Sequence, residues 1–244
     1  QRSLRPMHIL GIGVGHDAAA CLLADGEIVA MAAEERFSRI KHDAGFPSAA
    51  IIACLAAAGL EAGDLDVVAI AGSHLPLGTE RHLRLSPEQR AVLSAARPRG
   101  QRMAQVHLGD QLGELPLSVE RLVLDPACRI EHVNHHRCHA AAAYFTRRSD
   151  SPCLVLTLDG IGDAVSTAIW QGAGCTLTPL RHWGREGSLG WFYGTVTEAI
   201  GWEHGDGEGT TMALAAFGDS ARLLDQLAPF HPAYEAGDLA VPHD

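Results

Sequence analysis

The chain has 244 residues, of which 47% are hydrophobic and 20% are charged, a composition that can bury a full core in one or two domains. Its formal net charge of −10 argues against a broad surface for the phosphate backbone of nucleic acid. No apolar stretch reaches the ~20 residues of a membrane helix. The six cysteines are scattered without a CxxC pair, which favours a reducing environment. We therefore expect a cytoplasmic protein without nucleic-acid or membrane partners.

The chain opens with a pattern typical of three strands joined as hairpins. Residues 7–14 form an apolar run that ends in glycines, as a buried strand does. The runs 18–24 and 27–33 flank Asp25-Gly26, a pair that strongly favours a two-residue hairpin turn. The first hairpin carries the stretch GHDAA, with His16 and Asp17 next to each other.

A charged segment and a helix follow. Residues 34–47 are dense in charge and predict a polar loop. Residues 48–60 predict a helix that Ser48 caps and Gly59 stops. The run 66–72 is typical of a buried parallel strand.

The pattern weakens between residues 73 and 120, where we expect a long loop or lid-like insertion. Within it, residues 86–96 predict a helix with proline in the first turn. Residues 129–133 then predict a strand.

The stretch NHHRCHAAAAY follows this strand and predicts a helix. Asn134 is a good N-cap, and the alanine run favours helix. His135 and His139 then lie one turn apart on one face. Such a pair can share a metal ion, but it can also cap and pack a helix start without one.

The second half repeats the plan of the first. Residues 153–160, 162–170 and 175–183 predict three strands, and residues 188–201 predict a helix. LDGIGDAVS stands here where GIGVGHDAA stands in the first copy. This α/β duplication resembles the actin-like ATPase (ribonuclease H-like) fold, with residues 1–150 as the first unit. We expect residues 151–244 to be the start of a second, incomplete unit.

Three further stretches are candidates for binding. Asp159 and Asp163 flank two glycines, which suits a metal or metal–phosphate site, although Asp-Gly pairs also build turns without a ligand. A basic group could bind a phosphate-bearing substrate or form a solvated loop; it consists of Arg36, Arg39, Lys41 and His42. Residues 207–218 turn from glycines into helix, which offers backbone donors to an anion or is a structural turn.

Taken together, these motifs resemble the N-terminal part of the carbamoyltransferase family, which includes O-carbamoyltransferases of nodulation-factor, cephamycin and aminoglycoside biosynthesis. The matching stretches lie in order over residues 8–218 and include GHDAA, NHHRCHAAAAYF, LTLDGIGDAVS and GEGTTMALAAFGD. The resemblance implies a two-module enzyme. A C-terminal domain, outside this chain, makes carbamoyl-adenylate from carbamoyl phosphate and ATP. The actin-like N-terminal domain passes the carbamoyl group to a hydroxyl of a small-molecule natural product.

The resemblance also implies roles for individual residues. His135 and His139 correspond to the metal pair, usually of iron(II), and His16 to a base for the acceptor hydroxyl. Lys41 corresponds to a basic cofactor-binding position. The turn near the nucleotide phosphates corresponds to Asp159, Gly160, Gly162 and Asp163. The third metal ligand is expected beyond this chain, and Thr210 stands where the family has lysine.

Two other classes of function stay open from the sequence. One is a different actin-like enzyme, either a small-molecule kinase or a tRNA threonylcarbamoyl transferase. The other is a non-catalytic nucleotide-binding fragment. A second copy of the chain, in a homodimer, is also among the expected partners.

Overall fold

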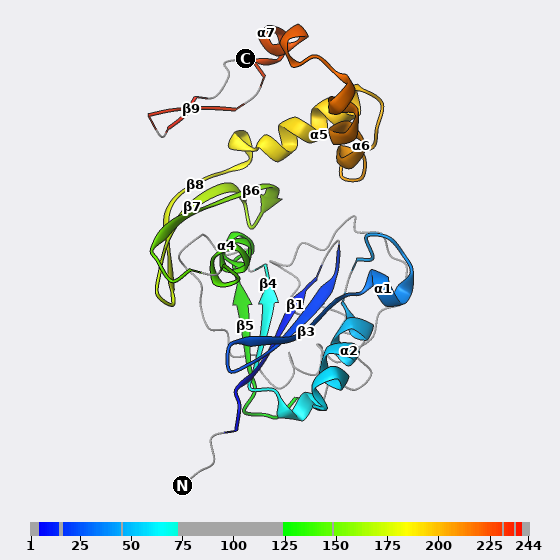
Figure 1. Cartoon of the computed structure of the whole chain (residues 1–244), viewed down its shortest axis with the longest axis vertical. Helices are drawn as coiled ribbons and strands as arrows, with labels where there is room; N and C mark the ends of the chain where they lie inside the picture. The colour runs from blue at the N-terminus through cyan, green and yellow to red at the C-terminus, as the bar shows by residue number, and fades with distance from the viewer. Residues whose placement is uncertain are drawn as a thin grey trace. The chain divides into compact units, whose positions relative to one another are not determined.

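The computed structural model shows a mixed α/β protein, as predicted (Figure 1). It describes residues 5–14, 17–44, 46–72, 124–147, 149–230, 232–236 and 238–240. The predicted helix at residues 86–96, with most of the insertion, lies outside the described residues. The chain divides into two compact units, Gln1–Leu75 with Thr79–His135, and Pro76–Gly78 with His136–Asp244. In the described part of the chain, no helix has the length and apolarity to cross a membrane.

The first unit is built on a five-stranded mixed sheet in the order β3-β2-β1-β4-β5. Its strands are β1 (His8–Gly13), β2 (Ala19–Ala24), β3 (Glu27–Ala33), β4 (Val67–Ala71) and β5 (Arg129–Val133). The first three are antiparallel neighbours, whereas β4 runs parallel to both β1 and β5. The predicted hairpin turn is confirmed, because Asp25 and Gly26 have φ of 49° and 87°, as a type I′ turn requires.

Helix α2 (Ser48–Ala58) packs against β2 and β3. Its buried side chains join those of the sheet in one apolar core, which includes Leu10, Ile12, Leu22, Ile51, Leu55, Val68, Ile70 and Ile130. The predicted stop at Gly59 is confirmed, since its φ is 65° and its N–H reaches the carbonyls of the last helical turn. A short 3-10 helix, Ala62–Asp64, leads into β4.

The charged segment before α2 differs from its prediction in two ways. It contains a one-turn helix, α1 (Glu35–Ser38), rather than loop throughout. The cap of α2 is also not Ser48, which is the first helical residue. The Glu34 carboxylate accepts the N–H groups of Ala49 and Ala50 at 3.1 and 2.8 Å. Glu34, fourteen positions before Ser48 in the chain, thus caps α2 in place of the Ser48 hydroxyl that we predicted.

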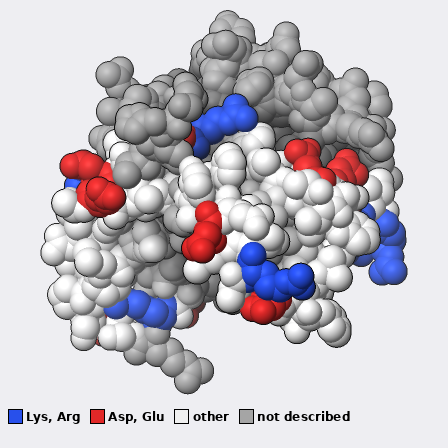
Figure 2. Space-filling model, turned by 90° about the horizontal axis from the view of Figure 1, so that it is seen from above, with Lys and Arg blue, Asp and Glu red and all other residues white. Residues whose placement is uncertain are grey.

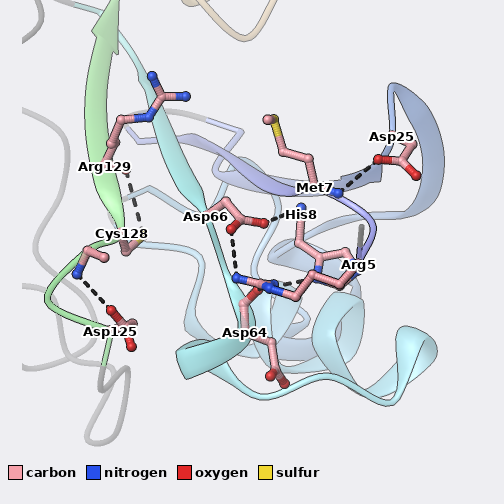
Figure 3. Close-up of polar contacts among 10 residues, drawn as sticks. Arg5, Met7, His8, Asp25, Asp64, Asp66, Asp125, Cys128 and Arg129 are labelled. Atoms are coloured by element: carbon pink, nitrogen blue, oxygen red, sulfur yellow. Dashed lines mark hydrogen bonds and ion pairs between the residues drawn. The ribbon is translucent and has the colours of Figure 1, made fainter. Parts of the chain in front are cut away.

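Asp66 anchors the start of β4 to the start of β1 (Figure 3). One of its oxygens accepts from the His8 backbone N–H at 2.8 Å, and the other pairs with Arg5 at 2.7 Å. On the other side of β1, Asp25 accepts from the Met7 N–H at 2.8 Å. These contacts fix the entry of the chain into the sheet.

The second unit opens with helix α4 (His135–Phe145) and an antiparallel sheet in the order β6-β7-β8. The strands are β6 (Cys153–Gly162), β7 (Val165–Ala173) and β8 (Thr176–Trp183), and helix α5 (Leu189–Ala199) follows. All four predicted elements of this half are therefore present. The Ser188 side chain caps α5 by accepting the Trp191 N–H.

Smaller elements complete the described part of the second unit. They are α6 (Glu208–Leu214), α7 (Leu224–Leu227), the hairpin β9 (Ala233–Glu235) with β10 (Asp238–Ala240), and the 3-10 helices Arg185–Gly187, Ala215–Phe217 and Ser220–Arg222. A second apolar core lies between α4 and the sheet and contains Ala140, Tyr144, Val155, Val165, Ala168, Trp170 and Leu177. We predicted a boundary between the units at residue 150, which would place α4 in the first unit. In the structure, the second unit includes α4 from His136 onward.

Candidate metal centre

Helix α4 presents the two predicted metal-binding histidines from its first and second turns. It starts at His135, directly after the fully buried Asn134. His139 follows one turn later, and about half of its side chain is exposed. The border between the two units falls just after His135, so the helix backbone itself holds this histidine beside His139.

Asp159 on β6 joins the two histidines. Each of His135, His139 and Asp159 offers one ligand atom, and these atoms all lie within 4.8 Å of one another. The His139 Nε2 and Asp159 Oδ2 atoms are 3.5 Å apart. Ligand atoms about 2.0–2.2 Å from one ion lie roughly 3–4 Å from each other, so small side-chain rotations would suffice. Two imidazoles and a carboxylate form a set of donors that suits divalent iron or zinc.

A backbone hydrogen bond fixes the orientation of the Asp159 carboxylate. Its Oδ1 accepts from the Gly160 backbone N–H at 2.6 Å, which leaves Oδ2 on the side of His139. The Ser188 hydroxyl lies 2.6 Å from the Gly160 carbonyl oxygen and 3.1 Å from that of Asp159. The N-terminus of α5 is therefore tied to the backbone that carries the carboxylate.

Gly190 allows this close approach of α5 to β6. A Cβ atom at this position would lie 2.7 Å from the Gly160 nitrogen and 2.9 Å from the Asp159 carbonyl carbon. Both are backbone atoms and cannot rotate away. The sequence motif SLGW therefore has a structural reason that sequence reasoning missed, because the contact joins segments that are 30 residues apart.

His136, the third histidine of this helix, is not positioned as a ligand. Its ring is fully buried, with Nδ1 2.8 Å from Thr157 Oγ1 and Nε2 2.8 Å from the Val165 carbonyl oxygen. Two such bonds contribute about 1–3 kcal/mol net, which is no more than an aliphatic side chain would gain by burial there, about 1.5–3 kcal/mol. Stability alone therefore does not favour histidine at this position.

The predicted nucleotide-binding turn forms the β6–β7 hairpin. Asp163 and Ala164 form its tip, with φ of 50° and 63°, and Gly162 pairs with Val165 at the end of the ladder. Asp159 lies further back on the strand. Among the described residues, the group of metal-ligand atoms contains Asp159 but not Asp163.

In the first unit, the structure brings the GHDAA and RFSRIKH motifs together. The His42 Nδ1 and Asp17 Oδ1 atoms are 2.7 Å apart, and the Ala18 N–H donates to the Asp43 carbonyl at 3.0 Å. Lys41 is exposed in the turn beside this pair. His16, the predicted base, lies outside the described residues. Sequence reasoning missed the contact between His42 and Asp17.

Two other predicted anion sites have limited extent. Helix α6 has only seven residues, too short to build a strong dipole at its N-terminus, and it carries Thr210 in its first turn. In the basic segment, Arg36 pairs with Glu35 at 3.2 Å. Figure 2 shows acidic and basic side chains of the described residues interspersed on the face that it draws.

Residues 8–235 match the family model of the carbamoyltransferase N-terminus. The chain therefore belongs to the carbamoyltransferase family, as the sequence motifs predicted. It is 31% identical over 237 residues, 93% of the chain, to Nodulation protein NolNO of Sinorhizobium fredii. It is 36% identical over 226 residues, 87% of the chain, to an uncharacterized protein of Synechocystis sp.. The chain covers 31% and 35% of these two proteins, about one third of their length.

Proposed function

We propose that this chain is the acceptor-modifying part of an enzyme that transfers a carbamoyl group to a hydroxyl of a small-molecule natural product. The donor is carbamoyl-adenylate, made from carbamoyl phosphate and ATP by a C-terminal adenylate-forming domain. The observation that carries this proposal is the family match over residues 8–235. The group of His135, His139 and Asp159 supports it, because the family motif that carries both histidines coincides with a geometry fit for metal.

We also infer that the fold is the actin-like duplication. In its support, the first unit has the order β3-β2-β1-β4-β5, with three antiparallel strands followed by two parallel ones. The second unit contains, after α4, a similar element of three antiparallel strands in the order β6-β7-β8. The recurrence of LDGIGDAVS at the β6–β7 hairpin, where GIGVGHDAA stands at the first hairpin, supports the same reading.

In this proposal His135, His139 and Asp159 would hold a divalent ion, iron(II) by family resemblance. Both histidines sit on one helix, and the carboxylate is fixed by Gly160, so little rearrangement is needed to form the set. When bound, such an ion supplies Lewis-acid stabilisation to an anionic phosphate oxygen. The nearness of Asp159 to both histidines supports it as a third ligand, in place of the one expected beyond this chain.

The transfer step needs an acid–base group and an anion-binding group from the protein. The acceptor oxygen attacks the carbamoyl carbon, the bond from this carbon to the adenylate oxygen breaks, and AMP leaves. We assign to His16 the role of the base that removes the proton of the acceptor hydroxyl. We assign to Lys41 the neutralisation of negative charge on the adenylate. The Gly160 N–H already donates to Asp159, so Gly162 and Asp163 remain as the nucleotide contacts of this turn.

The test is transfer of label from carbamoyl phosphate. The chain is incubated with labelled carbamoyl phosphate, ATP and a panel of hydroxyl-bearing acceptors, and the C-terminal part of a relative is added in trans. We expect labelled acceptor in amounts that match the AMP released. Release of AMP without labelled product for every acceptor, including sugars and aminoglycosides, would refute acceptor modification by this chain.

A further inference from the structure

The buried face of α4 carries one imidazole, that of His136, next to two residues of the apolar core. His136, Ala140 and Tyr144 follow one another at intervals of four, so they lie on one face of the helix. Their side chains are 0%, 0% and 4% exposed, respectively. Ala140 and Tyr144 belong to the apolar core against β6 and β7, and His136 sits at the end of this stripe next to the metal-ligand group.

The partners of His136 fix the position of its ring proton. The Val165 carbonyl oxygen can only accept, so Nε2 carries a proton and donates it in this bond. Nδ1 lies 2.8 Å from Thr157 Oγ1, and this hydroxyl oxygen also lies 3.3 Å from the Ala168 carbonyl oxygen and 3.4 Å from the Trp170 indole nitrogen. The ring is thus held at both ends by two different strands, β6 and β7.

The contact between His136 and Thr157 is adjacent to the contact between His139 and Asp159 in the metal centre. Thr157 and Asp159 are two residues apart on β6, so they point to the same face of the sheet. His136 and His139 are three residues apart on α4, so they are neighbours on the helix surface, and their rings meet edge to face at 6.0 Å. The pairs His136–Thr157, at 2.8 Å, and His139–Asp159, at 3.5 Å, therefore form two successive bridges between the same helix and the same strand.

We propose that His136 is the positioning residue of the metal centre. Through Thr157 and Val165 it sets the rotation and height of α4 against β6, and this brings His135 and His139 to Asp159. An apolar residue would pack in the same place but would not fix the first turn of the helix by hydrogen bonds to β6 and β7. This inference rests on the metal site of the proposed function and concerns metal affinity, which is measured without any transfer activity.

The test compares His136→Leu with Tyr144→Phe in metal titrations of the purified, metal-free chain. Binding of Co²⁺ is followed by its visible absorption, and binding of Zn²⁺ by calorimetry. We expect His136→Leu to lose about 10–100-fold in affinity, as changes in residues that orient metal ligands do. Tyr144→Phe removes the hydroxyl that donates to the Gly174 carbonyl at the far end of the stripe, and it should bind metal like the wild type.

If His136→Leu fails to fold, Thr157→Val provides a second test. Valine has nearly the shape of threonine, so this variant removes the hydroxyl that contacts His136 with little change in packing. It should weaken metal binding in the same direction, and in the double variant with His136→Leu it should add little. His136→Gln, which keeps an N–H for the Val165 carbonyl, should recover part of the affinity and of the Co²⁺ spectrum.

Three results would overturn the inference. Folded His136→Leu or Thr157→Val that binds metal with wild-type affinity would show that His136 only fills space. An equal loss in Tyr144→Phe would show a general effect of stability. A wild-type chain that binds no metal would remove the metal site and this inference, whereas carbamoyl transfer would still be judged by its own label assay.

Discussion

Replacing Gly190 by alanine would perturb the contact that holds Asp159 in place. The added Cβ would lie 2.7 and 2.8 Å from the nitrogen and Cα of Gly160, and 2.9 Å from the Asp159 carbonyl carbon. Carbon atoms in contact prefer about 3.5–4.0 Å. The first turn of α5 and strand β6 must therefore separate by roughly 1 Å.

This separation has two expected effects. Overpacking of this kind costs about 1–3 kcal/mol of unfolding free energy. It would also stretch the Ser188 contact to the Gly160 carbonyl, which is 2.6 Å in the structure. Since Asp159 is displaced together with this backbone, metal affinity should fall along with stability.

The assay is urea denaturation of Gly190→Ala, combined with a Zn²⁺ titration under native conditions. Gly209→Ala is the matched control, because Gly209 lies in helix α6 and its Cβ would meet nothing within 4 Å. There alanine should stabilise the chain by about 0.5–1 kcal/mol. If Gly190→Ala matched this control in stability and in metal affinity, the proposed role of the close approach would be refuted.

Three further outcomes are expected. Asp159→Asn should weaken Zn²⁺ binding at least about 10-fold in calorimetry, and unchanged affinity would remove Asp159 from the ligand set. Glu34→Ala should lower the unfolding free energy by about 0.5–2 kcal/mol in urea, as loss of a helix cap does; no change would mean that water replaces the carboxylate. Burial raises the pKa of the Cys54 thiol, so at pH 8 iodoacetamide should alkylate exposed Cys175 first, and equal rates would contradict this.

The shift at Cys54 also has a defined effect on stability. Burial is its main cause, and the neighbouring Cys21 adds to it. Because the folded-state pKa is raised, the neutral thiol is favoured in the fold. The resulting stability is fully present below the unfolded-state pKa of about 8.5 and is lost as pH rises through the folded-state pKa. Urea midpoints measured above pH 8.5 should therefore decline less in Cys54→Ala than in the wild type.

Local patterns in the sequence predicted most of the described elements. Period-two and apolar runs predicted the strands, and Asp25-Gly26 predicted the hairpin between β2 and β3. The spacing of His135 and His139 was enough to place them on one face, because helix geometry fixes positions four residues apart. These features are determined by interactions within short segments of the chain, so they can be predicted from the sequence alone.

Contacts through space were the part that could not be predicted. Asp159 was expected at a metal or metal–phosphate site near the nucleotide phosphates, but the sequence did not name it as the third ligand beside His139, because that place depends on how α4 packs on β6. The cap of α2 by Glu34 likewise depends on the path between β3 and α2. The pair of His42 and Asp17 joins residues 25 positions apart. Each of these contacts is set by tertiary packing, on which propensity and periodicity give no information.

The parallel pairing of β4 with β5 has a consequence for changes in the length of the chain between these two strands. Val67 pairs with Arg129 and Ala71 with Val133, so pairing these strands brings together distant chain positions, which carries an entropy cost of loop closure. Each doubling of such a loop costs only about 0.6 kcal/mol in closure entropy. Insertions or deletions between Ala71 and Arg129 should therefore leave the sheet almost equally stable. The same separation delays the β4–β5 ladder during folding, since distant segments meet more slowly than adjacent ones.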